Sequence, residues 1–489
     1  MKSNICIQNA PMLRYLTKDQ MDEIHYAGLE ILERTGVQVY HEESLDLLKS
    51  AGAIVEGTLV RIPEFLVKKA LVTVPSRVIL ADREGKRCMF LEGRRSYFGT
   101  GSCCPYTIDP YTGERRLATK NDVANMAKIC DYLPNIDFLM STNLVRDTYP
   151  EIGYIHEFDA MVRNSTKPVI VSLQDGQNTR DIIEMAETVA GGPDKLRKNC
   201  FLAVYSETTA PLRHSKDALE KVMVCAEKWV PIIHTVGQMA GATSPVTMAG
   251  ALAQANAELL SVLVIHQLKQ PGAPFLYGGT ITPIDMRTMA HPYGAPEFHV
   301  FSACLTELGV DYYKIPVFST GGCSDAKTFD QQAAAEATYS LLLSALSGGN
   351  LIHDIGFIDS GLTSSLAEIV FSNEVIEMIK HVVRGISYGD EEIALDVIDR
   401  VGPGGHYLGD EHTLNNFKRI YSPQLFTRES YASWVNNGSK NLGEKVDEKV
   451  KNILETYTPK PLDAEICKAL DSLIDRFTRE AAERNKAKV

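Results

Sequence analysis

Short runs of apolar and β-branched residues alternate along most of the chain with longer segments whose apolar positions repeat at helical spacing. Eight such runs occur, at 96–100, 136–143, 168–173, 201–206, 230–235, 274–279, 315–319 and 350–355. The helical segments that follow them cover 119–133, 150–164, 178–190, 214–228, 245–268, 296–308, 329–347 and 363–383. Strands that alternate with helices in this way predict parallel βαβ units.

Eight βαβ units over roughly 290 residues are the number and length typical of a TIM (β/α)8 barrel. A doubly wound open sheet has a similar alternation, but no G-x-G-x-x-G turn follows any of the eight runs. We therefore predict an α/β protein built on a TIM barrel. The run at 96–100 is the shortest of the expected strands, and a long loop follows it.

Helical segments flank the barrel pattern on both sides. Thr17 and Gln20 form a capping box at the start of a helix that Gly36 ends. The last part of the chain is helical and charged, a composition typical of a solvated or oligomer-capping helix. The predicted parts are a helical lead-in packed on the barrel over 1–90, the catalytic barrel over 91–407 and a helical extension over 408–489.

Composition and charge narrow the class of protein. The 489 residues are 44% hydrophobic and 23% charged, as in a folded enzyme, and a net charge of -12 argues against electrostatic binding of nucleic acid. No apolar run approaches the ~18 residues of a membrane helix, and Met1–Cys6 lacks the features of a signal peptide. The ten cysteines include no C-x-x-C pair. We expect a cytoplasmic protein with neither nucleic-acid nor membrane partners.

A TIM barrel forms its active site at the carboxyl ends of its strands. The expected strand ends supply Tyr97, Asn143, Gln174, Glu207, His234, Gln238, Tyr277, Thr280, Thr320, His353, Asp354 and Phe357. This set is rich in aromatic and neutral polar residues, and the chain contains no H-E-x-x-H, G-x-S-x-G or P-loop pattern. Glu207 and His353 stand out because each ends a central strand.

Two cysteine motifs at strand ends allow a metal-based interpretation. Cys323 follows two glycines, and the vicinal pair Cys103 and Cys104 lies at another strand end. Together they could supply thiolates to a methyl-transferring zinc site. Zinc needs three or four ligands, however, and adjacent cysteines rarely both reach one ion. We predict no metal site.

Aromatic residues at four strand ends suggest a different site. Tyr97, Tyr205, Tyr277 and Phe357 could converge on one pocket. Electron-rich ring faces bind quaternary ammonium groups, which have no hydrogen bond to donate. Packing in the core is the competing explanation for each ring taken alone.

Several long blocks of sequence carry a family resemblance. They are Gly241–Glu258, Pro271–Pro274, Asp285–Arg287, Gly321–Lys327, Asn350–His353 and Gly402–His406. These blocks resemble the trimethylamine:corrinoid methyltransferase (MttB-type) superfamily over about residues 12–450. The resemblance implies a TIM barrel and a methyl acceptor, a Co(I) corrinoid (cobalamin), that is borne by a separate carrier protein. It implies no tightly bound cofactor.

One block departs from the family pattern. The trimethylamine enzymes place pyrrolysine within a Lys-x-Pro-Asp-pyrrolysine-Gln-Ala-Gly block, and the corresponding stretch here is Lys-Thr-Phe-Asp-Gln-Gln-Ala-Ala from Lys327 to Ala334. Gln331 therefore stands at the pyrrolysine position. The chain resembles the non-pyrrolysine branch, whose members demethylate betaines such as glycine betaine, proline betaine or carnitine.

The resemblance assigns expected roles to the strand-end residues. Tyr97 and Phe357 face the trimethylammonium group, Glu207 supplies negative charge, and His353 or Gln331 binds the polar end of the substrate. The catalytic candidates are Glu207, His353 and Gln331, and the substrate-binding candidates are Tyr97, Phe357, Tyr205, Tyr277, Gln238 and Asp354. We also expect a homo-oligomer.

Two alternatives remain open at this point. The same scaffold could take a methyl group from another donor or pass it directly to tetrahydrofolate. The chain could also be a non-catalytic betaine-binding protein. Fold alone does not choose among them, because TIM barrels host many activities.

Overall fold

Eight parallel strands form a barrel at the centre of the molecule. A computed structural model describes residues 11–486, so the segment Met1–Cys6, for which we expect no signal peptide, lies outside the described residues. The strands are β6 (Tyr97–Thr100), β9 (Leu139–Met140), β10 (Val169–Ser172), β11 (Leu202–Glu207), β13 (Ile232–Ala240), β14 (Phe275–Pro283), β15 (Val317–Thr320) and β16 (Leu351–Ile355). A parallel bridge between Gly99 and Phe138 brings the two end strands together. The predicted TIM barrel is confirmed.

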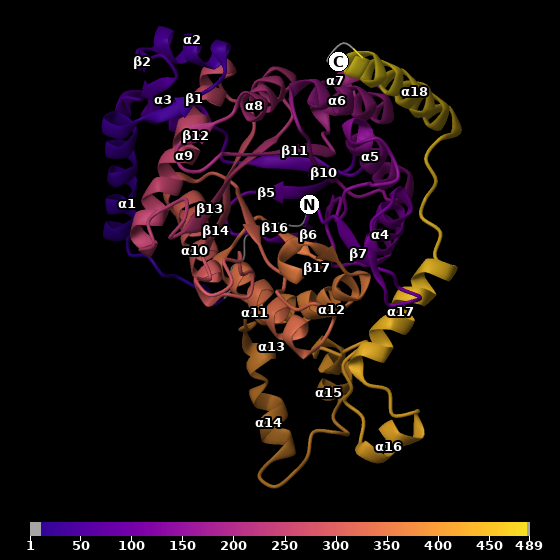
Figure 1. Cartoon of the computed structure of the whole chain (residues 1–489). Coiled ribbons are helices and arrows are strands. Elements are labelled where there is room, and N and C mark those ends of the chain that lie inside the picture. The colour runs from indigo at the N-terminus through magenta and orange to yellow at the C-terminus, as the bar shows by residue number, and fades with distance from the viewer. Residues whose placement is uncertain (1–10, 487–489) are drawn as a thin grey trace.

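Helices surround the barrel in chain order (Figure 1). They are α4 (Lys120–Tyr132), α5 (Gly153–Asn164), α6 (Gly176–Ala190), α7 (Pro193–Lys198), α8 (Lys216–Lys228), α9 (Met248–Lys269), α10 (Pro296–Thr306), α11 (Gln331–Ser347) and α12 (Leu366–Val383). Side-chain caps define many of the helix starts, because they satisfy amide groups that have no partner within the helix. Asp175 accepts from the amide of Asn178 at the start of α6, for example.

Helix α9 is more apolar than the sequence analysis allowed for. Within residues 11–486 it alone is long and apolar enough to cross a bilayer by length and composition, which corrects the expectation that no run approaches that size. Of its most apolar 18-residue window, 83% is buried inside the molecule. It packs against α1, α3 and β13, so it is a core helix.

The lead-in contributes helices on one side of the barrel. The capping box of Thr17 and Gln20 starts α1 as predicted, and a π-helical turn extends it to Gly36. Helices α1 and α3 pack on α9. The elements of this part are α1 (Lys18–Glu30), β1 (Val37–Val39), α2 (Glu42–Ala51), β2 (Ile54–Glu56), β3 (Leu59–Arg61) and α3 (Glu64–Thr73), and β12 (Arg213–His214) pairs with β1.

A β-hairpin of the lead-in closes the amino-terminal end of the barrel. Its strands are β4 (Val78–Ala81) and β5 (Arg87–Leu91), and β5 lies within the ring of strands in Figure 1. The buried side chains of Val78, Leu80, Met89 and Leu91 pack with inward residues of the barrel strands. The amide of Ala81 donates to the carbonyl of Cys200, just before β11, at 2.7 Å. The hairpin is therefore a floor, and the site belongs at the other end, called the mouth below.

The chain beyond α12 is helical, as predicted. Short helices form an arm that projects sideways from the barrel (Figure 1): α13 (Asp390–Ile393), α14 (Leu395–Val401), α15 (Glu411–Asn416) and α16 (Tyr431–Asn436). Helix α17 (Leu442–Thr456) then packs against α12 and α4, and α18 (Ala464–Lys486) packs against α6. Two small pairs complete the strands, β7 (Tyr106–Ile108) with β8 (Arg115–Leu117) and β17 (Phe357–Ile358) with β18 (Thr363–Ser364).

Candidate active site at the barrel mouth

Strand β11 brings a tyrosine and a carboxylate to the barrel interior. Tyr205 packs on Phe318 with ring centroids 5.9 Å apart. Its hydroxyl donates to Glu207 Oε2 at 3.0 Å and accepts from the hydroxyl of Thr235 at 3.1 Å. Glu207 is exposed although its neighbour Ser206 is fully buried, so its carboxylate reaches an accessible space at the mouth. Burial and the charge of Glu207 raise the pKa of Tyr205 well above its usual value, so the phenol stays a donor.

Strand β16 carries a histidine and an aspartate, just before its last residue Ile355, and both lie at the mouth. The His353 ring stacks on Phe318 at 3.8 Å, and its Nδ1 lies 2.7 Å from the carbonyl of Ser319. A carbonyl only accepts, so Nδ1 carries a proton. His353 Nε2 lies 3.1 Å from Asp354 Oδ1, and the hydroxyl of Thr320 donates to Asp354 Oδ2. The left-handed backbone of Asp354, with φ of 78°, interrupts the strand alternation at this point.

Two aromatic rings border the same region. A Cβ added to Gly101, at the end of β6, would lie 2.5 Å from both Asp354 Oδ1 and Phe357 Cζ, so the ring of Phe357 lies directly at the mouth. Tyr293 meets Phe357 edge to face at 6.3 Å. Burial and the charge of Asp354 raise the pKa of Tyr293 well above its usual value. Asp325 holds Tyr293 in place by accepting from its amide at 2.9 Å.

The mouth also contains a titratable carboxyl that comes from a helix. Glu157, in the first turns of α5, accepts from the amide of Val145 at 3.3 Å. Burial raises the pKa of Glu157 from 4.5 to about 7. Cys103 is exposed at the mouth, and desolvation by the surrounding atoms, together with the charges of Glu157 and Glu207, raises the pKa of its thiol. These three groups therefore share the side of the mouth next to β6 and β11.

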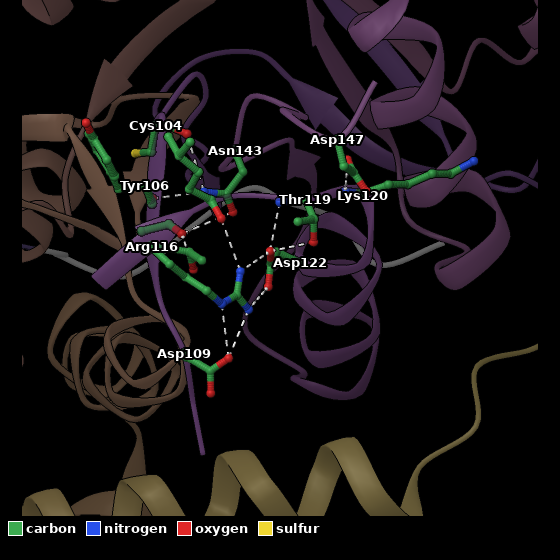
Figure 2. A network of polar contacts seen from close by, with 12 residues as sticks. Cys104, Tyr106, Asp109, Arg116, Thr119, Lys120, Asp122, Asn143 and Asp147 are labelled. Atoms are coloured by element: carbon green, nitrogen blue, oxygen red, sulfur yellow. Dashed lines mark hydrogen bonds and ion pairs between the residues drawn. The ribbon is translucent and has the colours of Figure 1, made fainter. Parts of the chain in front are cut away.

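A polar network fixes the loops on the outer side of Cys104 (Figure 2). Arg116, on β8, donates to both oxygens of Asp122 at 2.8 Å and to Asp109 at 3.0 Å. Asp122 closes the capping box that starts α4. Asn143, which follows β9, donates its side-chain amide to the carbonyl of Cys104 at 3.4 Å. The backbone around the vicinal cysteines is thus held rigidly at the rim.

The position of Tyr97 corrects its expected role. It begins β6 rather than ending it, and its hydroxyl accepts from the amide of Phe90 on the floor hairpin at 3.0 Å. Phe357 lies at Gly101, four residues further along β6. At about 3.3 Å per residue the two positions are ~13 Å apart along the strand, whereas a cation must lie within ~6 Å of each ring of a cage. Tyr97 belongs to the floor.

Tyr277 and Gln238 are also corrected, because both lie on the outer face of the barrel. Tyr277 is fully buried, and its hydroxyl donates to Asn256 of α9 at 3.0 Å. Gln238 alternates along β13 with the inward Thr235 and Gly237, which places it on the face of the surrounding helices. Its amide is buried without a hydrogen-bond partner among the described residues.

Gln331 lies on the surface at the first position of α11, after the capping residue Asp330. Its side chain makes no hydrogen bond within residues 11–486 and does not join His353. The structure therefore brings together Glu207, His353, Asp354, Tyr205 and Phe357 of the predicted set, and leaves Gln331 outside. Tyr293 and Glu157 are additions that strand-end analysis missed, since one lies in a loop and the other on a helix.

The cysteines do not form a cluster. Cys104 and Cys323 pack in a small apolar group with Phe357, whereas Cys103 donates to the hydroxyl of Ser102 at 3.3 Å. Among residues 11–486, no three His, Cys, Asp or Glu side chains are placed to hold a metal ion.

A barrel with a closed floor and a mouth lined by carboxylates and rings defines a TIM-barrel enzyme. The family model described as "Trimethylamine methyltransferase (MTTB)" matches residues 2–482, and the chain belongs to this family of methyltransferases.

Curated relatives cover nearly the whole chain. The chain is 35% identical to trimethylamine methyltransferase MttB of Desulfitobacterium hafniense (strain DSM 10664 / DCB-2), over 94% of this chain and 93% of that protein. It is 33% identical to MttB of Methanosarcina barkeri (strain Fusaro / DSM 804), over 96% of each chain. It is 29% identical to a glycine betaine methyltransferase of Desulfitobacterium hafniense (strain Y51), over 97% of this chain and 99% of that protein.

A solved structure shares the fold. The crystal structure of the Methanosarcina barkeri monomethylamine methyltransferase (MtmB) superposes with a TM-score of 0.50 over 91% of this chain and 88% of that chain. The sequences are 12% identical, so this likeness concerns the fold alone.

Proposed function

We propose that this methyltransferase moves a methyl group from a quaternary amine, such as a betaine, to the Co(I) corrinoid of a separate carrier protein. The observation that carries the proposal is the mouth, where the carboxylates of Glu207 and Asp354 lie among the rings of Tyr205, Phe357 and Tyr293. Ring faces and carboxylates both attract a permanent cation, and a quaternary ammonium leaves no buried donor unsatisfied.

The glutamine at position 331 supports a quaternary rather than a tertiary amine. The family pattern places pyrrolysine there in the trimethylamine enzymes, and a glutamine amide offers only hydrogen bonds. Overall identity to the trimethylamine relatives is higher, at 35% against 29%. Overall identity does not decide the substrate, because substrate choice depends on a few residues, and the missing pyrrolysine supports a quaternary amine even though Gln331 itself lies outside the group at the mouth.

The methyl transfer needs no side chain that acts as an acid or a base. The C–N bond breaks with its electron pair left on nitrogen, so a positively charged quaternary amine departs as a neutral tertiary amine. The corrinoid would supply a strong nucleophile from the carrier. The chain's own residues hold the cation, align its methyl group and exclude water. The floor hairpin closes the other end, so the methyl acceptor has to approach the mouth.

We also propose the partners, the cellular location and the cofactor state of the enzyme. Its partners are the carrier protein and a small amine, its location is the cytoplasm, and it holds no resident cofactor. The side chains of His353 and Asp354 and the partly protonated carboxyl of Glu157 lie at the mouth. These groups can bind the polar part of a substrate.

The test is methylation of free reduced cobalamin, followed by absorbance. Glycine betaine, proline betaine, carnitine, choline, trimethylamine and dimethylamine are offered at equal concentration, and products are identified by mass spectrometry. We expect turnover of a quaternary amine that stops at its dimethyl product. Trimethylamine turnover at a comparable rate would contradict the proposal. Turnover only with a folate acceptor, or betaine binding without methyl transfer, would favour the alternatives.

A further inference from the structure

The arm beyond α12 exposes an unusual amount of apolar surface. Twelve of the twenty-nine exposed large apolar side chains in residues 11–486 fall between residues 386 and 435, a span of about a tenth of the chain. The most exposed of them are Leu408 at 88%, Tyr431 at 79% and Ile420 at 76%. Scattered single apolar residues are normal on a surface, but such a concentration is not.

The arm has almost no core of its own. Among its apolar residues the structure buries Ala394, Val397 and Leu425. Its helices α13, α14, α15 and α16 have four to seven residues each, too few for isolated helices to be stable in water. A segment of this kind gains its stability from a surface that covers it.

The exposed area is large enough for a stable interface. Twelve large side chains that each expose about half or more of their surface add up to on the order of 1,000 Å². The largest apolar patch on a typical monomer is roughly 300–600 Å². A standard protein interface buries about 800 Å² per partner.

The charge of the arm excludes two kinds of occupant. Between residues 386 and 435 there are eight acidic and four basic residues, a net charge of −4. The dense negative charge of nucleic acid and of anionic membranes is therefore repelled, whereas a protein surface that carries charges of both signs, as the arm itself does, is not, which leaves a protein. Two arginines are already paired within the arm and its base, Arg400 with Asp410 and Arg419 with Glu392.

The position of the arm selects which protein. In Figure 1 the arm projects sideways, away from the barrel, on the side where α11 and α12 lie. A carrier that delivers a reactive group has to cover the mouth, which opens along the barrel axis. We propose that the arm is the surface through which two copies of this chain associate, as the same patch on both copies.

Matched variants of the full-length protein test the proposal. Leu408→Asp and Ile420→Asp place charge on the arm, and Val72→Asp, at a residue 85% exposed on α3, is the control. Because these side chains are already in water, none of the variants should unfold the monomer, which circular dichroism verifies. Sedimentation should show a wild-type dimer or higher assembly at micromolar concentration. The arm variants should raise its dissociation constant at least 100-fold, and Val72→Asp should leave it unchanged.

Three outcomes would overturn the proposal. One is a wild-type protein that stays monomeric at the highest concentration reached. Another is an assembly that the arm variants leave intact. The third is a monomeric wild type whose arm variants lose methyl transfer to a carrier protein but keep it with free cobalamin, which would assign the arm to the carrier. Since free cobalamin needs no carrier, failure of this proposal leaves the proposed function untouched.

Discussion

Tyr97 begins β6, whereas Phe357, on β17, lies against Gly101 just beyond the other end of that strand, so substitutions at the two positions should have different effects. We expect Phe357→Ala to raise KM for the quaternary amine by about 2–30-fold, because one ring face contributes ~0.5–2 kcal/mol to a bound cation. Tyr97→Phe removes only the acceptor for the Phe90 amide, so it should lower the melting temperature and leave KM unchanged. Steady-state kinetics on both variants decides the matter. Equal changes in KM would contradict the placement of Tyr97 in the floor.

The backbone of Gly101 lies close against Asp354 and Phe357 at the mouth. A methyl group there would lie 2.5 Å from Asp354 Oδ1 and Phe357 Cζ, so Gly101→Ala has to displace both. We expect at least a 10-fold loss of kcat/KM, about 1.4 kcal/mol of transition-state stabilisation, in a folded protein. Gly409→Ala is the control, since a Cβ there meets no atom within 4 Å. Wild-type kinetics in Gly101→Ala would place the substrate elsewhere.

The raised pKa of Glu157 predicts a pH dependence of stability. An acid whose folded-state pKa is raised favours folding most below its unfolded pKa, and this advantage is lost as pH rises from 4.5 through about 7. We expect the wild type to lose up to ~3 kcal/mol relative to Glu157→Gln across this range, and no more above it. Urea unfolding of both proteins from pH 4.5 to 8 measures the difference. A constant difference would show that Glu157 titrates normally.

For individual residues, the sequence predicts which strands contribute to the site, but it predicts less well which side chains on those strands face the barrel interior. Strands in this barrel are buried on both faces, so a two-residue alternation of polar and apolar positions is missing, and Tyr277 could not be assigned to the outer face. Tyr97 was misplaced because its strand is only four residues long. Tyr293 and Glu157 lie outside any strand, where spacing carries no information about the mouth.

Among the elements, the floor hairpin has the clearest separate role. Leu80 and Leu91 are fully buried against inward side chains of the barrel. We expect Leu80→Ala to cost about 2–5 kcal/mol of unfolding free energy, the usual range for such a cavity. KM should stay at the wild-type value, because the hairpin lies at the end opposite to the mouth. Chemical denaturation together with kinetics tests this, and a changed KM at wild-type stability would contradict it.

The eight barrel strands and their helices could be predicted from the sequence because apolar runs and helical periodicity repeat regularly. The largest differences are in β9, which covers only Leu139–Met140 of the expected 136–143, and in β13 and β14, which extend to Ala240 and Pro283, well beyond the expected ends. The sequence predicts the lead-in as a helical segment. That two of its strands, β4 and β5, fill the barrel floor depends on contacts between segments far apart in the chain, which local patterns do not encode.

For the whole molecule, one apolar core links the parts that the sequence separates. A continuous cluster of buried side chains runs from Met21 in the lead-in, through the barrel, to Phe477 and Ala481 in α18. We expect the three predicted parts to unfold together in a single calorimetric transition, with equal calorimetric and van't Hoff enthalpies. Two resolved transitions would show that the lead-in or the extension is an independent domain.

The closed floor has a consequence for the order of events in turnover. A barrel with one opening gives the small molecule a single route in and out, and on the proposed function the carrier covers that route during transfer. The amine must therefore enter first, and the demethylated product stays trapped until the methylated carrier departs. Binding and release are then ordered: the carrier binds last and leaves first. The lifetime of the docked complex therefore sets an upper limit on the rate of catalysis.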